Sequence, residues 1–187
     1  MQFVKLRDAA KIVSGLVLCI AARFALAPLP NVEPIMGVVL PFARKYGAVV
    51  GALFAFLALA SIDFVTGRFG LWTLYCGLAY AALGFAAGKY LPRFKLSRWR
   101  FAGFAAVGVV AYDAVTALAF GLQFNQPLWA TALAQIPFTA MHLLGGVGFA
   151  FIASPLLSRY FVENDAPLAV FTGNGVAKPA KARVKRV

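Results

Sequence analysis

Charged residues are scarce in this chain of 187 residues. Only 13% of the residues are Asp, Glu, Lys or Arg, whereas 62% are hydrophobic. A soluble domain has about 25% charged and about 45 to 50% apolar residues, and a chain of this length cannot bury such an apolar excess in one core. The composition therefore excludes an aqueous globular fold and predicts an integral membrane protein.

Acidic residues, cysteine and histidine are rarer still. The chain has six Asp and Glu, two cysteines and one histidine. Cys19 and Cys76 each lie within an apolar run, which favours buried thiols over a disulfide or a metal pair. We therefore expect no metal site and no other cofactor.

Motifs of catalysis and of ATP hydrolysis are missing as well. The sequence contains no HExxH, no GxSxG and no phosphate-binding GxxxxGK[ST] pattern. We therefore expect no catalytic residues, no enzyme activity and no ATPase within this chain. An intramembrane enzyme has little support.

Long apolar runs dominate the sequence instead. They predict an all-α integral membrane bundle of six transmembrane helices, near residues 10–28, 34–44, 46–65, 71–91, 101–121 and 131–158. The second run covers only about 16 Å of a hydrocarbon core about 30 Å thick. It is either a tilted span in a thinned bilayer or a re-entrant half-helix.

The formal net charge of +12 is distributed asymmetrically along the chain. If the N-terminus is inside, 16 of the 18 Lys and Arg residues fall in cytoplasmic segments, and only Arg23 and Arg68 do not. The positive-inside rule therefore predicts that both termini are cytoplasmic. Trp72 and Trp129 at outer helix ends and Trp99 at an inner end agree with this orientation. The cations thus indicate membrane topology, and we expect a lipid bilayer around the chain and no nucleic-acid partner.

Composition divides the chain into three segments. Residues 1–9 are predicted to be a cytoplasmic N-terminus, residues 10–163 the transmembrane domain, and residues 164–187 a basic, disordered cytoplasmic tail. The first apolar run imitates a secretory signal, but Arg23 interrupts the region where cleavage would occur. We therefore expect the first helix to stay attached.

Polar side chains within the predicted helices and their outer loops gather in the outer half of the bundle. The candidate substrate-binding residues are Arg23, Asn31, Glu33, Asp63, Trp72, Tyr75, Asp113, Gln135, Thr139 and His142. Polar groups inside a membrane cost free energy unless they are paired or face water. A cavity open to the outside and lined by these groups suits a water-soluble organic ligand with charged and planar parts.

Each of these residues also has a purely structural interpretation. Arg23 can neutralise Asp63 or Asp113 in an intramembrane pair, or extend its guanidinium to the outer headgroups. His142 can form an interhelical hydrogen bond, and Trp72 can anchor a helix at the interface. The concentration of such residues in the outer half favours a site over isolated roles.

Small residues recur at a spacing of four, which lets helices approach closely in a membrane. Such pairs are Gly47 with Gly51, Gly84 with Gly88, and Ala21 with Ala25. We expect most of them to serve packing within the bundle.

Four short stretches together carry a resemblance to a known family: LPNVEP at 29–34, GAVVG at 47–51, DFVTG at 63–67 and GLWTLY at 70–75. Over residues 10–160 the chain resembles the substrate-binding S component of energy-coupling-factor (ECF) vitamin transporters. The resemblance implies a six-helix protein of a bacterial or archaeal cell membrane that captures a vitamin or related micronutrient near the outer surface. It also implies a transmembrane coupling subunit and two cytoplasmic ATPases as partners, and it matches Ala21 and Ala25 to small residues that contact the coupling subunit.

A function of another class stays open. The chain can be a small scaffold of a cell-envelope assembly complex, in which the polar residues serve helix packing and the basic tail contacts cytoplasmic partners. Ligand binding by the isolated protein discriminates between the two.

The topology is testable with single cysteines in sealed cells. Cysteines at Asn31 and Gln123 should react with an impermeant thiol reagent added outside, because both are predicted to lie in outer loops. A cysteine at Lys95 should react only after the cells are opened. The opposite pattern would overturn the predicted orientation.

Overall fold

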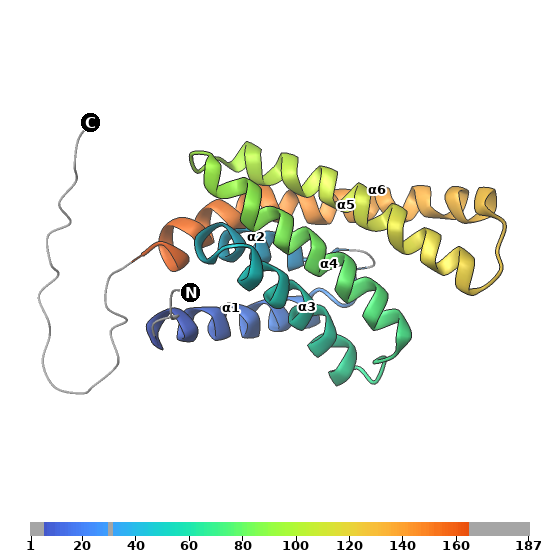
Figure 1. The fold of residues 1–187 in the computed structure, drawn as a ribbon, viewed down its shortest axis with the longest axis horizontal. Helices are drawn as coiled ribbons and strands as arrows, with labels where there is room; N and C mark the ends of the chain where they lie inside the picture. The colour runs from blue at the N-terminus through green and yellow to red at the C-terminus, as the bar shows by residue number, and fades with distance from the viewer. Residues whose placement is uncertain (1–5, 30–31, 165–187) are drawn as a thin grey trace, which may run out of the picture.

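A computed structural model describes residues 6–29 and 32–164, and within these ranges the chain is helical without strands (Figure 1). The helices are α1 (Leu6–Ala25), α2 (Ile35–Tyr46), α3 (Ala48–Val65), α4 (Leu71–Tyr90), α5 (Arg98–Gln123) and α6 (Leu128–Leu157). A short 3-10 helix, η1 (Leu91–Arg93), follows α4, and a π-helical turn, η2 (Ser158–Val162), follows α6. All six helices lie within a few residues of the predicted ranges. The tail predicted for residues 164–187 lies, except for Asn164, outside the described residues.

Four segments are long and apolar enough to cross a membrane: Ala48–Val65, Leu71–Arg93, Arg98–Gln123 and Leu128–Val162. Most of the residues in these segments are not buried by the rest of the bundle, which leaves apolar surface for lipid. They indicate a multi-pass membrane protein. The other two helices differ, since α1 carries four charged residues and α2 has only 12 residues. The prediction of six helices is confirmed, and that of six spans stays a prediction.

Consecutive helices run in opposite directions, so the connections alternate between two ends of the bundle (Figure 1). We call the end that holds Leu6 and Val162 the terminal end, and the end that holds the turns at Gly67 and Asn125 the distal end. The Lys11 ammonium donates hydrogen bonds to the carbonyl oxygens of Val162, at 3.1 Å, and Asn164, at 2.7 Å. These bonds hold the start of α1 against η2, at the end where the predicted cytoplasmic cations lie.

The short helix α2 is the most completely buried element. Every residue from Ile35 to Ala43 is buried. The Phe42 ring stacks on Phe54 with 4.8 Å between ring centroids, and the Ser154 hydroxyl donates to the Gly37 carbonyl oxygen at 2.8 Å. Protein therefore covers α2, and its 12 residues, about 18 Å long, do not have to match the bilayer thickness. This burial favours the interpretation of α2 as a half-helix.

Glycines bring the backbones of α3 and α4 into contact. A methyl group added at Gly84 would lie 2.6 Å from the carbonyl carbon of Gly51, and one added at Gly88 would lie 2.5 Å from Gly47 and Ala48. Side chains larger than hydrogen do not fit at these distances. The predicted packing role of the glycines on α3 and α4 is confirmed, whereas Ala21 and Ala25 are exposed on α1.

Alanine at Gly84 should destabilise the bundle, because its methyl group must push α3 and α4 apart. Overpacking of this kind costs about 1 to 3 kcal/mol. Gly103→Ala on α5 is the matched control, since no atom lies within 4 Å of the added methyl group. Unfolding in detergent should show a lower free energy of unfolding for Gly84→Ala and little change for Gly103→Ala. Equal effects of the two changes would contradict the glycine contact.

Candidate functional site

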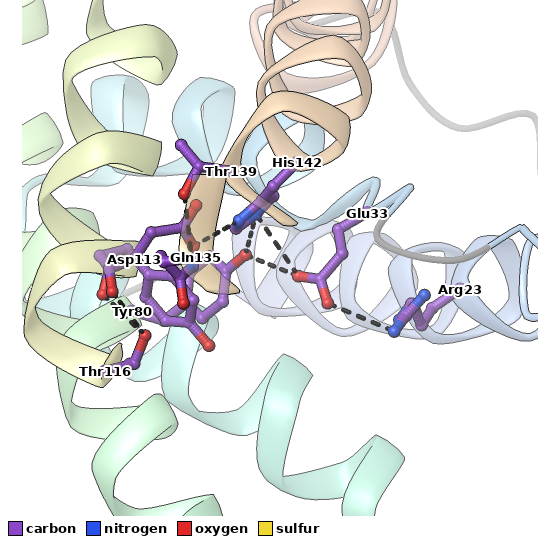
Figure 2. A network of polar contacts seen from close by, with 9 residues as sticks. Arg23, Glu33, Tyr80, Asp113, Thr116, Gln135, Thr139 and His142 are labelled. Atoms are coloured by element: carbon purple, nitrogen blue, oxygen red, sulfur yellow. Dashed lines mark hydrogen bonds and ion pairs between the residues drawn. The ribbon is translucent and has the colours of Figure 1, made fainter. Parts of the chain in front are cut away.

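Five polar side chains from separate segments meet in one hydrogen-bonded chain, which we call the central network (Figure 2). Its members are Arg23 on α1, Glu33 before α2, Tyr80 on α4, Asp113 on α5 and His142 on α6. Arg23 Nη2 lies 3.3 Å from Glu33 Oε1, and the Tyr80 hydroxyl donates to Glu33 Oε2 at 2.6 Å. The Tyr80 hydroxyl also lies 3.2 Å from His142 Nε2, and His142 Nδ1 lies 2.8 Å from Asp113 Oδ1. The network thus links four helices, α1, α4, α5 and α6, and the connection between α1 and α2 through side chains.

The central network lies at mid-height in the bundle because α2 is short. Tyr80 lies halfway along α4, and its partner Glu33 comes two residues before the first residue of α2. The connection from α1 therefore enters the bundle to mid-height, and α2 fills the terminal half. A carboxylate just before a helix start is also favoured by the helix dipole. The length of α2 thus leaves room for Glu33 inside the bundle.

A glycine on α6 helps to place His142 against α5. A methyl group at Gly146 would lie 3.0 Å from Val109 Cγ2, so the absence of a side chain there permits a close approach of the two helices. His142 is one turn before Gly146, and it reaches Asp113, one turn after Val109. Because the helices approach closely at Gly146 and Val109, His142 and Asp113, one turn away, lie near enough for the imidazole and the carboxyl group to meet.

The central network has no net charge when each of its contacts is a hydrogen bond. Its three contacts among Glu33, Tyr80, His142 and Asp113 are all hydrogen bonds when those four side chains carry three hydrogens between them. One arrangement is a Tyr80 hydroxyl, an imidazolium and two carboxylates. Every distribution of three hydrogens leaves these four groups with one negative charge, which Arg23 neutralises. A buried network with no net charge avoids the cost of an isolated ion in the membrane.

The network runs from the protein surface into its interior. The side chains of Arg23 and Glu33 are 25% and 18% exposed. Tyr80, Asp113 and His142 are buried. A change at the buried end is therefore connected by hydrogen bonds to the partly exposed end on α1.

A groove of about 360 Å³ lies between α5 and α6 beside the buried end of the network. Its polar lining residues are Asp113, Thr131, Gln135 and Thr139, and its apolar lining includes Leu118. The Gln135 amide donates to the Thr139 hydroxyl oxygen at 3.3 Å. In the described part of the chain, Asp113 Oδ2 is buried and has no hydrogen-bond partner, although Oδ1 is bonded to His142. A buried acceptor without a donor costs about 1 to 3 kcal/mol, so a ligand that donates a hydrogen bond there gains this free energy.

The structure brings together six predicted site residues in the network and the groove, namely Arg23, Glu33, Asp113, Gln135, Thr139 and His142, and places Asp63 elsewhere. The Thr73 hydroxyl donates to Asp63 Oδ2 at 2.7 Å and accepts from the Gly70 amide at 3.1 Å. Asp63 therefore fixes the connection between α3 and α4. The interpretation of Arg23 as a partner of Asp63 or Asp113 is also wrong, because its ion pair is with Glu33.

Two predicted aromatic residues lie at the distal end, away from the described contacts of the network. The rings of Trp72 and Tyr75 are 6.5 Å apart, and Trp72 packs edge-on against Phe120 at 5.7 Å. These contacts join α4 to α5, which agrees with a structural role for Trp72. Asn31 lies outside the described residues.

Sequence reasoning missed Tyr80, the centre of the network, and its neighbour Tyr112. Their rings are 4.4 Å apart. A tyrosine in the middle of an apolar helix is a sequence signal for a buried polar network, because a buried phenol hydroxyl needs a hydrogen-bond partner.

Polar contacts at the terminal end form a second cluster that was not expected. Lys11 is 4% exposed, and Arg44 forms an ion pair with Glu163. The Tyr46 hydroxyl donates to Asp8 at 3.3 Å. Lys11 and Arg44, predicted to be cytoplasmic cations, therefore take part in contacts between elements at this end.

No family model, no curated protein and no solved structure matches this chain. Within residues 6–29 and 32–164, no three His, Cys, Asp or Glu side chains are grouped so that they can hold a metal ion. The function is therefore inferred from the central network and the groove beside it.

Removing the Tyr80 hydroxyl should destabilise the protein. Tyr80→Phe leaves Glu33 and His142 each without one partner, which should lower the free energy of unfolding by about 1 to 3 kcal/mol. Tyr90→Phe is the matched control, because Tyr90 is 48% exposed and its ring packs on Phe94. Thermal unfolding in detergent would measure both. A loss for Tyr80→Phe no larger than that for Tyr90→Phe would show that the network does not stabilise the fold.

Proposed function

We propose that this chain is the substrate-binding S component of an ECF-type transporter and binds a water-soluble vitamin or related micronutrient in the α5–α6 groove. The observation that carries the proposal is the Asp113 carboxyl group, which belongs to a residue that lines the groove. One of its oxygens is bonded in the central network, and the other is buried and has no hydrogen-bond partner among the described residues. Unsatisfied polar atoms in native proteins call for an explanation, and a bound donor is the simplest one.

The lining of the groove favours a particular kind of ligand. Asp113 offers an acceptor, and Gln135 and Thr139 offer both donors and acceptors, while Val110 and Leu118 offer apolar contact. A volume of about 360 Å³ lies at the small end of the range for organic ligands. The groove therefore suits a small planar molecule with an amine or ring N–H group directed at Asp113.

The central network gives the bound ligand a route to α1. A donor on Asp113 Oδ2 changes the hydrogen bond between Asp113 and His142, and this change passes through Tyr80 to Glu33 and Arg23. Arg23 lies between Ala21 and Ala25, which are exposed on α1. We propose that these two alanines contact the coupling subunit, so that it responds to the occupancy of the groove.

Transport by this chain needs partners and a defined orientation. The sequence has no phosphate-binding loop, so two cytoplasmic ATPases would power uptake through the transmembrane coupling subunit. We place the protein in the bacterial or archaeal cell membrane with six spans, both termini in the cytoplasm and the distal end outside. The antiparallel arrangement of the six helices supports this topology.

The scaffold function has one observation in its favour. Most polar groups of the central network have hydrogen-bond partners within the bundle, as expected of residues that only hold helices together. Mild affinity purification from native membranes, followed by mass spectrometry, discriminates between the functions. Recovery of a coupling subunit, two ATPases and a retained small molecule would support transport. Recovery of envelope-assembly proteins without a ligand would favour the scaffold.

Ligand binding should depend on the groove and not on Asp63. The purified protein would be titrated with thiamine, riboflavin, cobalamin and a deazapurine, with thermal stabilisation and calorimetry as readouts. For the compound that binds, Asp113→Asn or Gln135→Ala should weaken affinity by about 10- to 100-fold, the value of a hydrogen bond to a charged group.

The matched control is Asp63→Asn, which removes a carboxylate that contacts Thr73. It should leave the affinity unchanged. Equal affinity in the Asp113, Gln135 and Asp63 variants would remove the groove from the ligand site, provided that all the variants are monodisperse.

A further inference from the structure

A second polar surface lies at the terminal end, where α5 begins and α6 ends. It is a groove of about 500 Å³, which we call the basic groove. Its lining residues include Ser97, Arg98, Trp99, Phe151, Arg159 and Tyr160. Trp99 and Tyr160 are 73% and 63% exposed. Exposed Trp and Tyr side chains at the ends of apolar helices are typical of the level of the lipid headgroups.

The two arginines of the basic groove face it without an acidic partner. The Arg98 guanidinium lies 5.4 Å from the centroid of the Phe151 ring, and that of Arg159 lies 5.5 Å from the centroid of Tyr160. In residues 6–29 and 32–164 neither guanidinium is in an ion pair. The basic groove is therefore complementary to an anion, and planar rings hold both cations in position.

An apolar groove of about 780 Å³ continues from the basic groove along α6. The two grooves share Trp99, Phe151 and Ile152. None of the residues that line the apolar groove is ionisable, and on α6 they extend from Ile152 back to Ala140. Twelve helical residues rise about 18 Å, which is slightly more than half of a hydrocarbon core about 30 Å thick. The apolar groove is thus as long as one leaflet is deep.

We propose that the two grooves together bind one anionic phospholipid. Its phosphate lies between Arg98 and Arg159 and accepts a hydrogen bond from Ser97, and one acyl chain lies in the apolar groove. A soluble anion would leave the apolar groove uncovered, and a lipid without net charge would leave the arginines unneutralised. Only an amphipathic anion uses both parts. This site is at the opposite end of α5 from the Asp113 groove, so it does not depend on the proposed function.

Fluorescence quenching tests the site with defined lipids. In a variant whose only tryptophan is Trp99, made by Trp72→Phe and Trp129→Phe, the emission would be measured in phosphatidylcholine vesicles that contain brominated phosphatidylglycerol. Brominated phosphatidylcholine is the comparison. Phosphatidylglycerol should half-quench Trp99 at a mole fraction lower by about five-fold or more, since each cation near a membrane surface contributes about a five-fold preference for anionic lipid.

Two sets of variants distinguish a specific lipid site from a general electrostatic attraction of anionic lipid to a basic protein. Arg98→Gln with Arg159→Gln should abolish the preference, and the corresponding double change to Lys should keep part of it. Arg93→Gln with Lys95→Gln removes the same charge from exposed positions at the same end that do not line the groove, and it should change nothing. A variant whose only tryptophan is Trp129, which is 70% exposed at the distal end, should show no preference.

Each outcome decides the proposal. Loss of the preference in the Arg98 and Arg159 variant alone supports a lipid site in the basic groove. Equal loss in the Arg93 and Lys95 variant would show a diffuse electrostatic effect and overturn the proposal. Equal quenching of Trp99 by the two brominated lipids would do so as well, and so would resistance to both, because no lipid would then lie beside Trp99. Circular dichroism and gel filtration would establish that each variant is folded.

Discussion

The rest of the bundle depends on the pairing of polar groups where water is absent. Inside a membrane an unpaired donor, acceptor or charge costs several kcal/mol. The buried Tyr80 and His142 avoid this cost through their hydrogen bonds to Glu33 and Asp113. These hydrogen bonds, together with the ion pair between Arg23 and Glu33, fix the relative positions of α1, α4, α5 and α6 at one depth. The fold and the candidate site therefore rest on the same contacts, and the unpartnered oxygen of Asp113 is where these contacts end.

Two other features of the fold accompany these contacts, the short length of α2 and the glycine contact between α3 and α4. Because α2 begins at mid-height in the bundle, Glu33, in the connection just before it, can reach Tyr80. Because Gly51 and Gly84 let the backbones of α3 and α4 touch, close packing holds the middle of this hairpin. A hydrogen bond from Thr73 to Asp63 fixes its distal end.

The helices were predictable from the sequence and the network mostly was not. Apolar runs indicate the helices in the sequence, about 20 residues long in five cases and about 11 in the case of α2, so the positions of all six helices followed from local composition. Glycine spacing likewise predicted that these residues serve helix packing, and the structure adds that they pack α3 against α4. The partner of Arg23 depends on how deeply the α1–α2 connection enters the bundle, and no local pattern encodes that depth. For the same reason the bond between Asp63 and Thr73 beside the α3–α4 turn, and the central position of Tyr80, are not evident from the sequence.

The electrical neutrality of the central network has a consequence for motion in a charged membrane. A membrane potential does work of about 2.3 kcal/mol on each elementary charge moved through 100 mV, and it does none on a group of zero net charge. A shift of the network along the membrane normal is therefore insensitive to voltage, even though it contains an arginine and carboxyl groups.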